Sequence, residues 1–142
     1  MLFPEQNFME NNEPDPTLFY EGVELFNAGR YHEAHDCWEE MWHVCSAFDR
    51  NFYKGLIHCA ICIYHATREN AAGANKLYHS GIAYLRQYSN PYRGIDHYLL
   101  CDLLTQYCQP LLTGATIGPL VTGSKPCINL RKDDGSTELF HE

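Results

Sequence analysis

The chain has 142 residues, of which 45% are hydrophobic and 13% aromatic, so it suits one domain whose core needs no disulfide or metal. Its 10 basic and 18 acidic residues give an acidic protein with a formal net charge of −8. This disfavours nucleic acid and anionic membranes as partners, because both are bound through basic side chains. No apolar run approaches the ~20 residues of a membrane span, and the N-terminus lacks the basic start of a secretory signal. We therefore expect a cytoplasmic location.

Helical periodicity runs through most of the chain. Residues 1–16 are polar and contain three prolines, which indicates an N-terminal arm. Beyond this arm, apolar residues recur at helical spacing, and turn residues separate the periodic segments. Five helices are predicted, over residues 17–28, 31–45, 51–69, 72–87 and 95–108. The sequence therefore predicts an all-α fold, a compact helical bundle over residues 17–110.

Two features predict how these helices are arranged. The segment 51–69 is apolar nearly all round, which is typical of a central helix. The connection at Gly29 is very short, and glycine readily supplies the left-handed conformation that ends a helix. We therefore expect the helices on either side of Gly29 to lie side by side and antiparallel.

The C-terminal part has a different character. Pro110 is expected to close the last predicted helix, because proline interrupts helical hydrogen bonding. Several glycines and prolines then break any periodicity, so residues 111–142 are predicted to form an irregular extension. Within it, residues 128–130 either pair as small strands or pack as an extended tail.

The segment 26–42 carries the strongest indication of chemistry. With Trp38 at the centre of the buried stripe, His35 lies inside the edge of the stripe and Glu39 on its flank, one turn apart. The carboxylate can orient the imidazole for general base catalysis, both can bind a divalent metal, or the pair can be a structural salt bridge. Burial of either group without a partner costs several kcal/mol, so we expect both to be paired. The structural and functional interpretations carry equal weight.

A second polar line follows the predicted helix 51–69. It contains Lys54, His58 and His65, opposite the main apolar stripe. If this helix is central, that face must meet another element or line a cleft; otherwise the histidines are exposed. We expect His65 to approach His35 and Glu39 from across the bundle. Further pocket candidates are Tyr31, Glu33, Asp36, Trp42, Lys54 and His58.

The seven cysteines show no regular spacing that would indicate a disulfide framework. Cys59 and Cys62 form a CxxC motif, but the surrounding pattern is helical and a second such motif is absent. Small buried apolar residues are the favoured interpretation, and a metal or redox role is the alternative.

Several motifs together resemble the family DUF309, a domain of unknown function. The likeness covers about residues 18–88 and rests on Gly29-x-Tyr31-x-Glu33-x-His35-Asp36-x-x-Glu39-x-x-Trp42, Phe52-Tyr53-x-Gly55-Leu56-Ile57, His65 and Asn70-x-x-Gly73-Ala74-x-x-Leu77. The resemblance implies a small all-helical bundle with no established activity. The chain departs from the family pattern at His43, where arginine is usual, and at Lys54 and His58, which replace glutamine.

Two functions remain open from the sequence. The favoured one is a binding or assembly module that meets a protein partner or a second copy of itself. The alternative is a metal-assisted hydrolase or other small-molecule enzyme, with His35 as base or ligand, Glu39 as its partner and His65 as a third group. The sequence contains no phosphate-binding glycine loop or nucleophile motif that would specify a reaction.

Overall fold

In the computed structural model, the part of the chain that is described, residues 14–131, forms six α-helices and one short 3-10 helix without a β-sheet. The elements are α2 (Thr17–Asn27), α3 (Tyr31–Val44), η1 (Ala47–Asp49), α4 (Arg50–Thr67), α5 (Ala71–Leu85), α6 (His97–Tyr107) and α7 (Gln109–Leu112). The predicted all-α fold is confirmed, and each of the five predicted helices is present with small shifts at its ends. Most of the predicted N-terminal arm, residues 1–13, lies outside the described residues.

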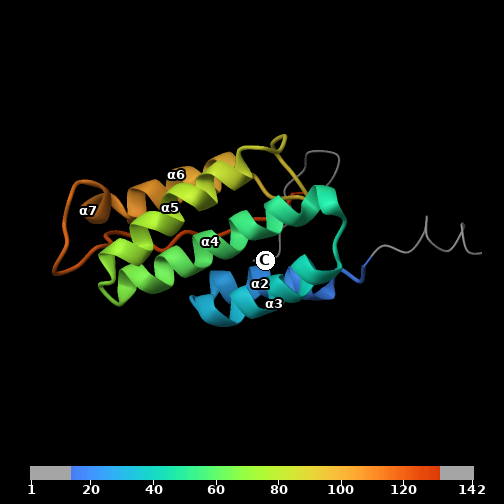
Figure 1. Cartoon of the computed structure of the whole chain (residues 1–142), viewed down its shortest axis with the longest axis horizontal. Helices are drawn as coiled ribbons and strands as arrows, with labels where there is room; N and C mark the ends of the chain where they lie inside the picture. The colour runs from blue at the N-terminus through green and yellow to red at the C-terminus, as the bar shows by residue number, and fades with distance from the viewer. Residues whose placement is uncertain (1–13, 132–142) are drawn as a thin grey trace, which may run out of the picture.

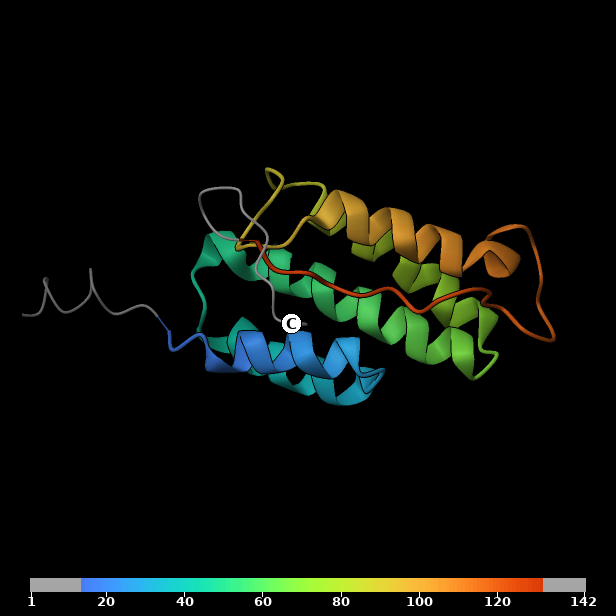
Figure 2. The same cartoon turned by 180° about the vertical axis from the view of Figure 1, so that it is seen from behind.

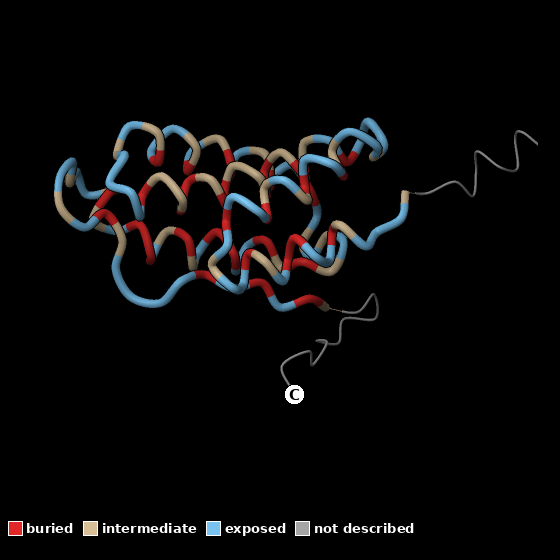
Figure 3. The backbone as a smooth tube through the Cα atoms, turned by 90° about the horizontal axis from the view of Figure 1, so that it is seen from below, coloured by how far each residue is buried: buried red, intermediate tan, exposed pale blue. Residues whose placement is uncertain are grey.

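Helix α4 is the central element of the bundle. Figure 1 shows it crossing the middle of the molecule, with α2 and α3 on one side and α5 and α6 on the other. Its buried residues include Phe52, Leu56, Cys59 and Ile63. Figure 3 shows buried and exposed positions alternating along the turns of the helices. The apolar character on nearly all sides of this helix is therefore explained by neighbours on both sides.

Helices α2 and α3 approach each other closely. A Cβ atom on Gly22 would lie 2.3 Å from Nε1 of Trp38, so only glycine leaves room for the indole ring. The same Nε1 donates a hydrogen bond to the carbonyl oxygen of Phe19 at 3.1 Å. Gly29 between the helices has φ of +82°, the left-handed conformation expected there. Trp38 is fully buried and fixes the position of α3 against α2.

The C-terminal extension packs along the bundle as an extended segment. Figure 2 shows residues up to 131 running lengthwise beside α4. Leu120, Ile128 and Leu130 are buried, and Leu130 forms a single bridge with Ile95. The side chain of Asn27 holds this segment, because it accepts a hydrogen bond from the Ile128 N–H at 2.7 Å and donates one to the Ile128 carbonyl at 2.9 Å. Of the two interpretations of residues 128–130, extended packing is therefore the better description.

The predicted fifth helix ends before Pro110, because α6 stops at Tyr107. The short helix α7 that follows was not predicted, and Pro110 lies in its first turn. The first turn of a helix tolerates proline, because its N–H groups have no partner within the helix. The remaining predicted extension, residues 132–142, lies outside the described residues.

A buried ion pair anchors the start of α4. The carboxylate of Asp49, only 4% exposed, accepts hydrogen bonds from Arg93 Nε at 2.9 Å and Nη2 at 2.5 Å. It also accepts one from the Tyr92 hydroxyl at 2.5 Å. Nearby, the Tyr88 hydroxyl donates to the carbonyl oxygen of Phe48 at 2.5 Å. These bonds join the start of α4 to the loop between α5 and α6.

The cysteines are free thiols, as the sequence analysis favoured, and the described helices do not have the length and apolar character of a membrane span. All seven cysteines are free thiols, and Cys59 and Cys62 are buried within α4 as core residues. Burial raises the pKa of the Cys59 thiol well above its ordinary value. Among residues 14–131, every helix is too short or too polar to cross a membrane.

Candidate metal-binding site and the neighbouring cavity

One face of α3 presents a group of potential metal ligands. His32, His35 and Asp36, here called the His–His–Asp group, place one ligand atom each within 4.8 Å of one another. The shortest separation is 3.0 Å, between His35 Nδ1 and Asp36 Oδ1, and His32 Nδ1 lies 3.9 Å from Asp36 Oδ2. Glu39 extends the group, with Oε1 3.7 Å from His35 Nε2. His32 is three and four residues from His35 and Asp36, and His35 is four residues from Glu39, so each of these pairs lies one helical turn apart.

The His35–Glu39 pair is less buried than expected. The His35 side chain is 25% exposed and that of Glu39 is 51% exposed, so the pair lies at the edge of the core and not within it. A helical projection also separates Asp36 from His35. In the structure, the short aspartate side chain turns back and its oxygen reaches the neighbouring ring nitrogen. The group is therefore accessible from solvent rather than enclosed in the core.

His65 does not join this group. Its Nδ1 lies 3.3 Å from Nδ2 of Asn70, and its Cδ2 lies 3.0 Å from where a Cβ on Gly73 would be. His65 therefore faces the turn between α4 and α5. The expected meeting of His65 with His35 and Glu39 is not formed, because the helix rotation carries this side chain toward α5. Within residues 14–131, the His–His–Asp group is the one cluster of three or more potential ligands at such distances.

The other polar residues of α4 also meet α5. His58 Nδ1 lies 2.7 Å from the Ser80 hydroxyl, and burial lowers the pKa of His58. The Lys54 ammonium lies 5.5 Å from the centre of the Tyr84 ring. The polar face of α4 therefore meets another element, α5, which is one of the alternatives that the sequence left open.

Trp42 has a structural environment. The guanidinium carbon of Arg50 lies 4.8 Å from the centre of its ring, a cation–π distance. Trp42 thereby helps to join the end of α3 to the start of α4. Trp42, Lys54 and His58 do not line the cavity described next.

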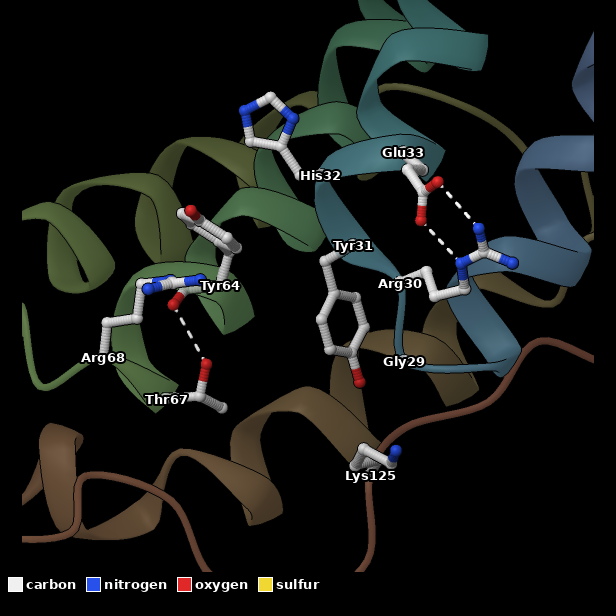
Figure 4. Close-up of a pocket in the computed structure, with 9 residues that line it drawn as sticks. All are labelled: Gly29, Arg30, Tyr31, His32, Glu33, Tyr64, Thr67, Arg68 and Lys125. Atoms are coloured by element: carbon white, nitrogen blue, oxygen red, sulfur yellow. Dashed lines mark hydrogen bonds and ion pairs between the residues drawn. The ribbon is translucent and has the colours of Figure 1, made fainter.

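A cavity of about 380 Å³ opens at the start of α3, next to the His–His–Asp group. Figure 4 shows it between the turn before α3, the C-terminal end of α4 and the C-terminal segment. Its lining residues are Gly29, Arg30, Tyr31, His32, Glu33, Tyr64, Thr67, Arg68 and Lys125. His32 belongs both to this cavity and to the His–His–Asp group, and its ring lies 5.4 Å from that of Tyr64.

Two of the predicted pocket candidates, Tyr31 and Glu33, line this cavity. Arg30 donates two hydrogen bonds to Glu33, at 2.5 and 2.7 Å, so that carboxylate is already paired. Tyr31 is only 6% exposed, and its buried hydroxyl has no hydrogen-bond partner among the described residues. Burial raises the pKa of Tyr31, so it stays neutral.

Sequence reasoning missed three parts of this region. His32 was not among the predicted site residues, although its spacing of three and four residues to His35 and Asp36 gives the signal for a shared face. Arg68 and Lys125 were not predicted, because the fold brings them to Tyr31 from distant parts of the chain. The local sequence around either residue contains no motif that would have indicated this.

Comparisons with known proteins agree with the motifs in α3 and α4. The family model described as a domain of unknown function, DUF309, matches residues 19–77. The predicted resemblance is confirmed over this segment, which extends from α2 into α5. The chain is also 29% identical over 102 residues to an uncharacterized protein, YpuF, of Bacillus subtilis (strain 168). That match covers 69% of this chain and 59% of the relative, so the chain spans about three fifths of that protein.

Proposed function

We propose that the protein is a binding module whose α3 face takes up a divalent transition-metal ion. The observation that carries this proposal is the convergence of two imidazoles and a carboxylate, with ligand atoms within 4.8 Å of one another on one helix. Imidazole and carboxylate together suit ions such as Zn²⁺, Co²⁺ and Ni²⁺. His32 and Asp36 are 60% and 63% exposed, so their side chains are free to adjust toward an ion.

The ligand set also supports an assembly role. Three protein ligands leave at least one coordination position open on such an ion. Because the group faces solvent, a side chain from a protein partner or from a second copy of this chain can reach that position. Sedimentation of the purified protein with and without added Zn²⁺ tests this, and the expected result is a larger species only with the metal. A monomer under both conditions would contradict the assembly role, but it would not contradict the proposal that the protein binds a metal.

Metal binding is tested by titration of the untagged full chain with Co²⁺ and Zn²⁺, followed by absorption spectroscopy and calorimetry. We expect one equivalent to bind, and His35→Ala to weaken binding more than about tenfold, because it removes a direct ligand. His79→Ala is the matched control, since His79 is an exposed histidine on α5 outside the group. Equal affinities in the wild type, His35→Ala and His79→Ala would refute the site.

Proton competition gives a second readout for the same site. Histidine binds a metal only when its imidazole is neutral, so the affinity should fall as the solution is made more acidic. This acid dependence should be weaker in His35→Ala, which retains one histidine in the group. An affinity that does not change with pH would exclude the histidines as ligands.

Metal-assisted hydrolysis is a second candidate function. The observation that favours it is the cavity beside His32, where a substrate would lie close to an ion held by the His–His–Asp group. Such an ion would act as a Lewis acid or activate a bound water. Hydrolysis of nitrophenyl phosphate and nitrophenyl acetate with added Zn²⁺ tests this, and it should be lost in Asp36→Asn. Equal rates in Asp36→Asn and wild type would refute it.

A cytoplasmic location stays part of this proposal. It is supported by the seven free cysteines, since thiols persist in reducing compartments. Cys127 gives a direct test, because it is exposed and open to modification. Its recovery from cells as a free thiol is expected, and recovery in a mixed disulfide would argue against this location.

A further inference from the structure

We infer that the cavity at the start of α3 binds a phosphate group, a site that goes beyond metal uptake on α3. The cavity is cationic although the whole chain has a formal net charge of −8. Three basic residues line it, Arg30, Arg68 and Lys125, against one acidic residue, Glu33. Because Arg30 and Glu33 neutralise each other, Arg68 and Lys125 supply the charge that is available to a ligand.

Arg68 and Lys125 have no acidic partner among residues 14–131. The guanidinium carbon of Arg68 lies 4.4 Å from the centre of the Tyr64 ring, which holds the planar group in place and leaves its N–H groups free. Lys125 is exposed, and its ammonium lies 2.6 Å from where a Cβ on Gly29 would be, so it extends across the turn before α3. Two uncommitted cations match the double negative charge of a phosphate better than a carboxylate.

The start of α3 adds hydrogen-bond donors. Among the described residues no side chain caps this end of α3, so the first N–H groups of the helix are open to a ligand. The helix dipole and these N–H groups favour an anion at such an end. Residues 29–33 line the cavity, so the start of α3 forms part of its wall.

The hydroxyl of Tyr31 gives an independent indication of a ligand. Figure 4 shows its ring extending from the start of α3, with the hydroxyl end pointing toward Lys125. Tyr31 is only 6% exposed, yet its hydroxyl has no hydrogen-bond partner within residues 14–131. A buried polar group without a hydrogen bond is unfavourable, so such groups are rare and point to a missing partner. A phosphate oxygen held beside the Lys125 ammonium would supply that partner.

The test is an amide NMR titration of the full chain with inorganic phosphate, in the presence of a chelator so that metal plays no part. We expect saturable shifts centred on residues 30–33, 67–68 and 125. The double variant Arg68→Gln/Lys125→Gln should bind at least about tenfold more weakly, because it loses two charge-assisted contacts. The control Lys76→Gln/Arg86→Gln removes two exposed cations of α5 and its C-terminal end, outside the cavity, and should bind as the wild type does. Shifts spread over all basic residues, or equal losses in both double variants, would overturn the inference.

Tyr31→Phe separates a ligand contact from a structural role. The variant removes a hydroxyl that makes no hydrogen bond to the described part of the chain, so the melting temperature should stay the same or rise. Phosphate binding should nevertheless weaken several-fold. An unchanged affinity, or a clear loss of thermal stability, would remove the hydroxyl from the site and overturn its use as evidence for a ligand.

Phenyl phosphate identifies the source of the phosphate group. If it binds more tightly than inorganic phosphate, the ligand is an ester whose organic part enters the cavity, and equal affinities would indicate the free ion. Acetate that binds as well as phosphate would overturn the assignment to phosphate. The phosphate and metal proposals fail separately, because Arg68→Gln/Lys125→Gln should retain Co²⁺ binding and His35→Ala should retain phosphate binding.

Discussion

The buried Asp49–Arg93 pair and the His–His–Asp group are both clusters of ionisable side chains, but they differ in how completely they are paired. Asp49 is 4% exposed and accepts three hydrogen bonds from Arg93 and Tyr92. In the His–His–Asp group the side chains are 25% to 63% exposed, and the Asp36 oxygens lie 3.0 Å from a ring nitrogen of His35 and 3.9 Å from one of His32. The first cluster uses its hydrogen-bonding capacity inside the protein, whereas the second keeps part of it for solvent or a ligand.

This difference separates stability from binding in the same small bundle. A buried and paired carboxylate leaves charged and polar groups without partners when it is removed. An exposed imidazole leaves groups that water can satisfy. We therefore expect changes in the Asp49 cluster to alter the free energy of unfolding, and changes in the His–His–Asp group to alter ligand affinity.

The largest expected effect follows from Asp49→Ala. The variant strands the Tyr92 hydroxyl and the guanidinium of Arg93, although Arg93 is 42% exposed and partly recovers its hydration. We expect a loss of about 3 kcal/mol in the free energy of unfolding, measured by urea denaturation. Asp102→Ala is the control, because Asp102 is an exposed aspartate on α6 and should change stability little. A loss below about 1 kcal/mol for Asp49→Ala would remove the proposed contrast between the two clusters.

A smaller effect is expected in alkaline solution from Tyr92. Burial, together with its hydrogen bond to Asp49, raises the pKa of Tyr92 to about 12, whereas a tyrosine in the unfolded chain has a pKa of about 10. Between these values the unfolded chain releases the proton and the folded protein retains it. The stability from this group is therefore complete below about pH 10 and is lost as the pH rises toward about 12.

Tyr92→Phe tests this pH dependence. The variant should be less stable at neutral pH, because it removes a hydrogen bond to Asp49, but its stability should fall less steeply above pH ~10. Urea denaturation at several pH values measures both quantities. The exposed residue Tyr98 provides the control variant Tyr98→Phe. Equal alkaline slopes in wild type and Tyr92→Phe would show that Tyr92 titrates alike in the folded and unfolded states.

The comparison also explains what the sequence predicts and what it does not. The helices follow from local periodicity, and the His–His–Asp group needs only α3 to form, since its members are at most four residues apart. The pairing of Asp49 with Arg93 joins residues 44 apart in the chain and depends on the loop between α5 and α6. A single sequence carries no local signal for such a contact.

The same physical reason applies to errors at the candidate site. The orientation of His65 depends on how α4 rotates between two neighbours, which periodicity determines poorly when a helix is apolar nearly all round. Lys125 reaches the turn at Gly29 only because the C-terminal segment packs along the bundle. The residues of the cavity therefore follow from tertiary packing and not from a motif.

The smallest expected effect on stability follows from His35→Ala. Its carboxylate neighbours Asp36 and Glu39 are 63% and 51% exposed, so water replaces the imidazole when it is removed. We expect a loss of less than about 1 kcal/mol by urea denaturation, while Co²⁺ binding falls more than about tenfold. His43→Ala is the matched control, because it removes an exposed histidine from the same helix with the same change in helix propensity. A loss well above that of His43→Ala would support a structural salt bridge at His35, and the group would then resemble the Asp49 cluster in its role.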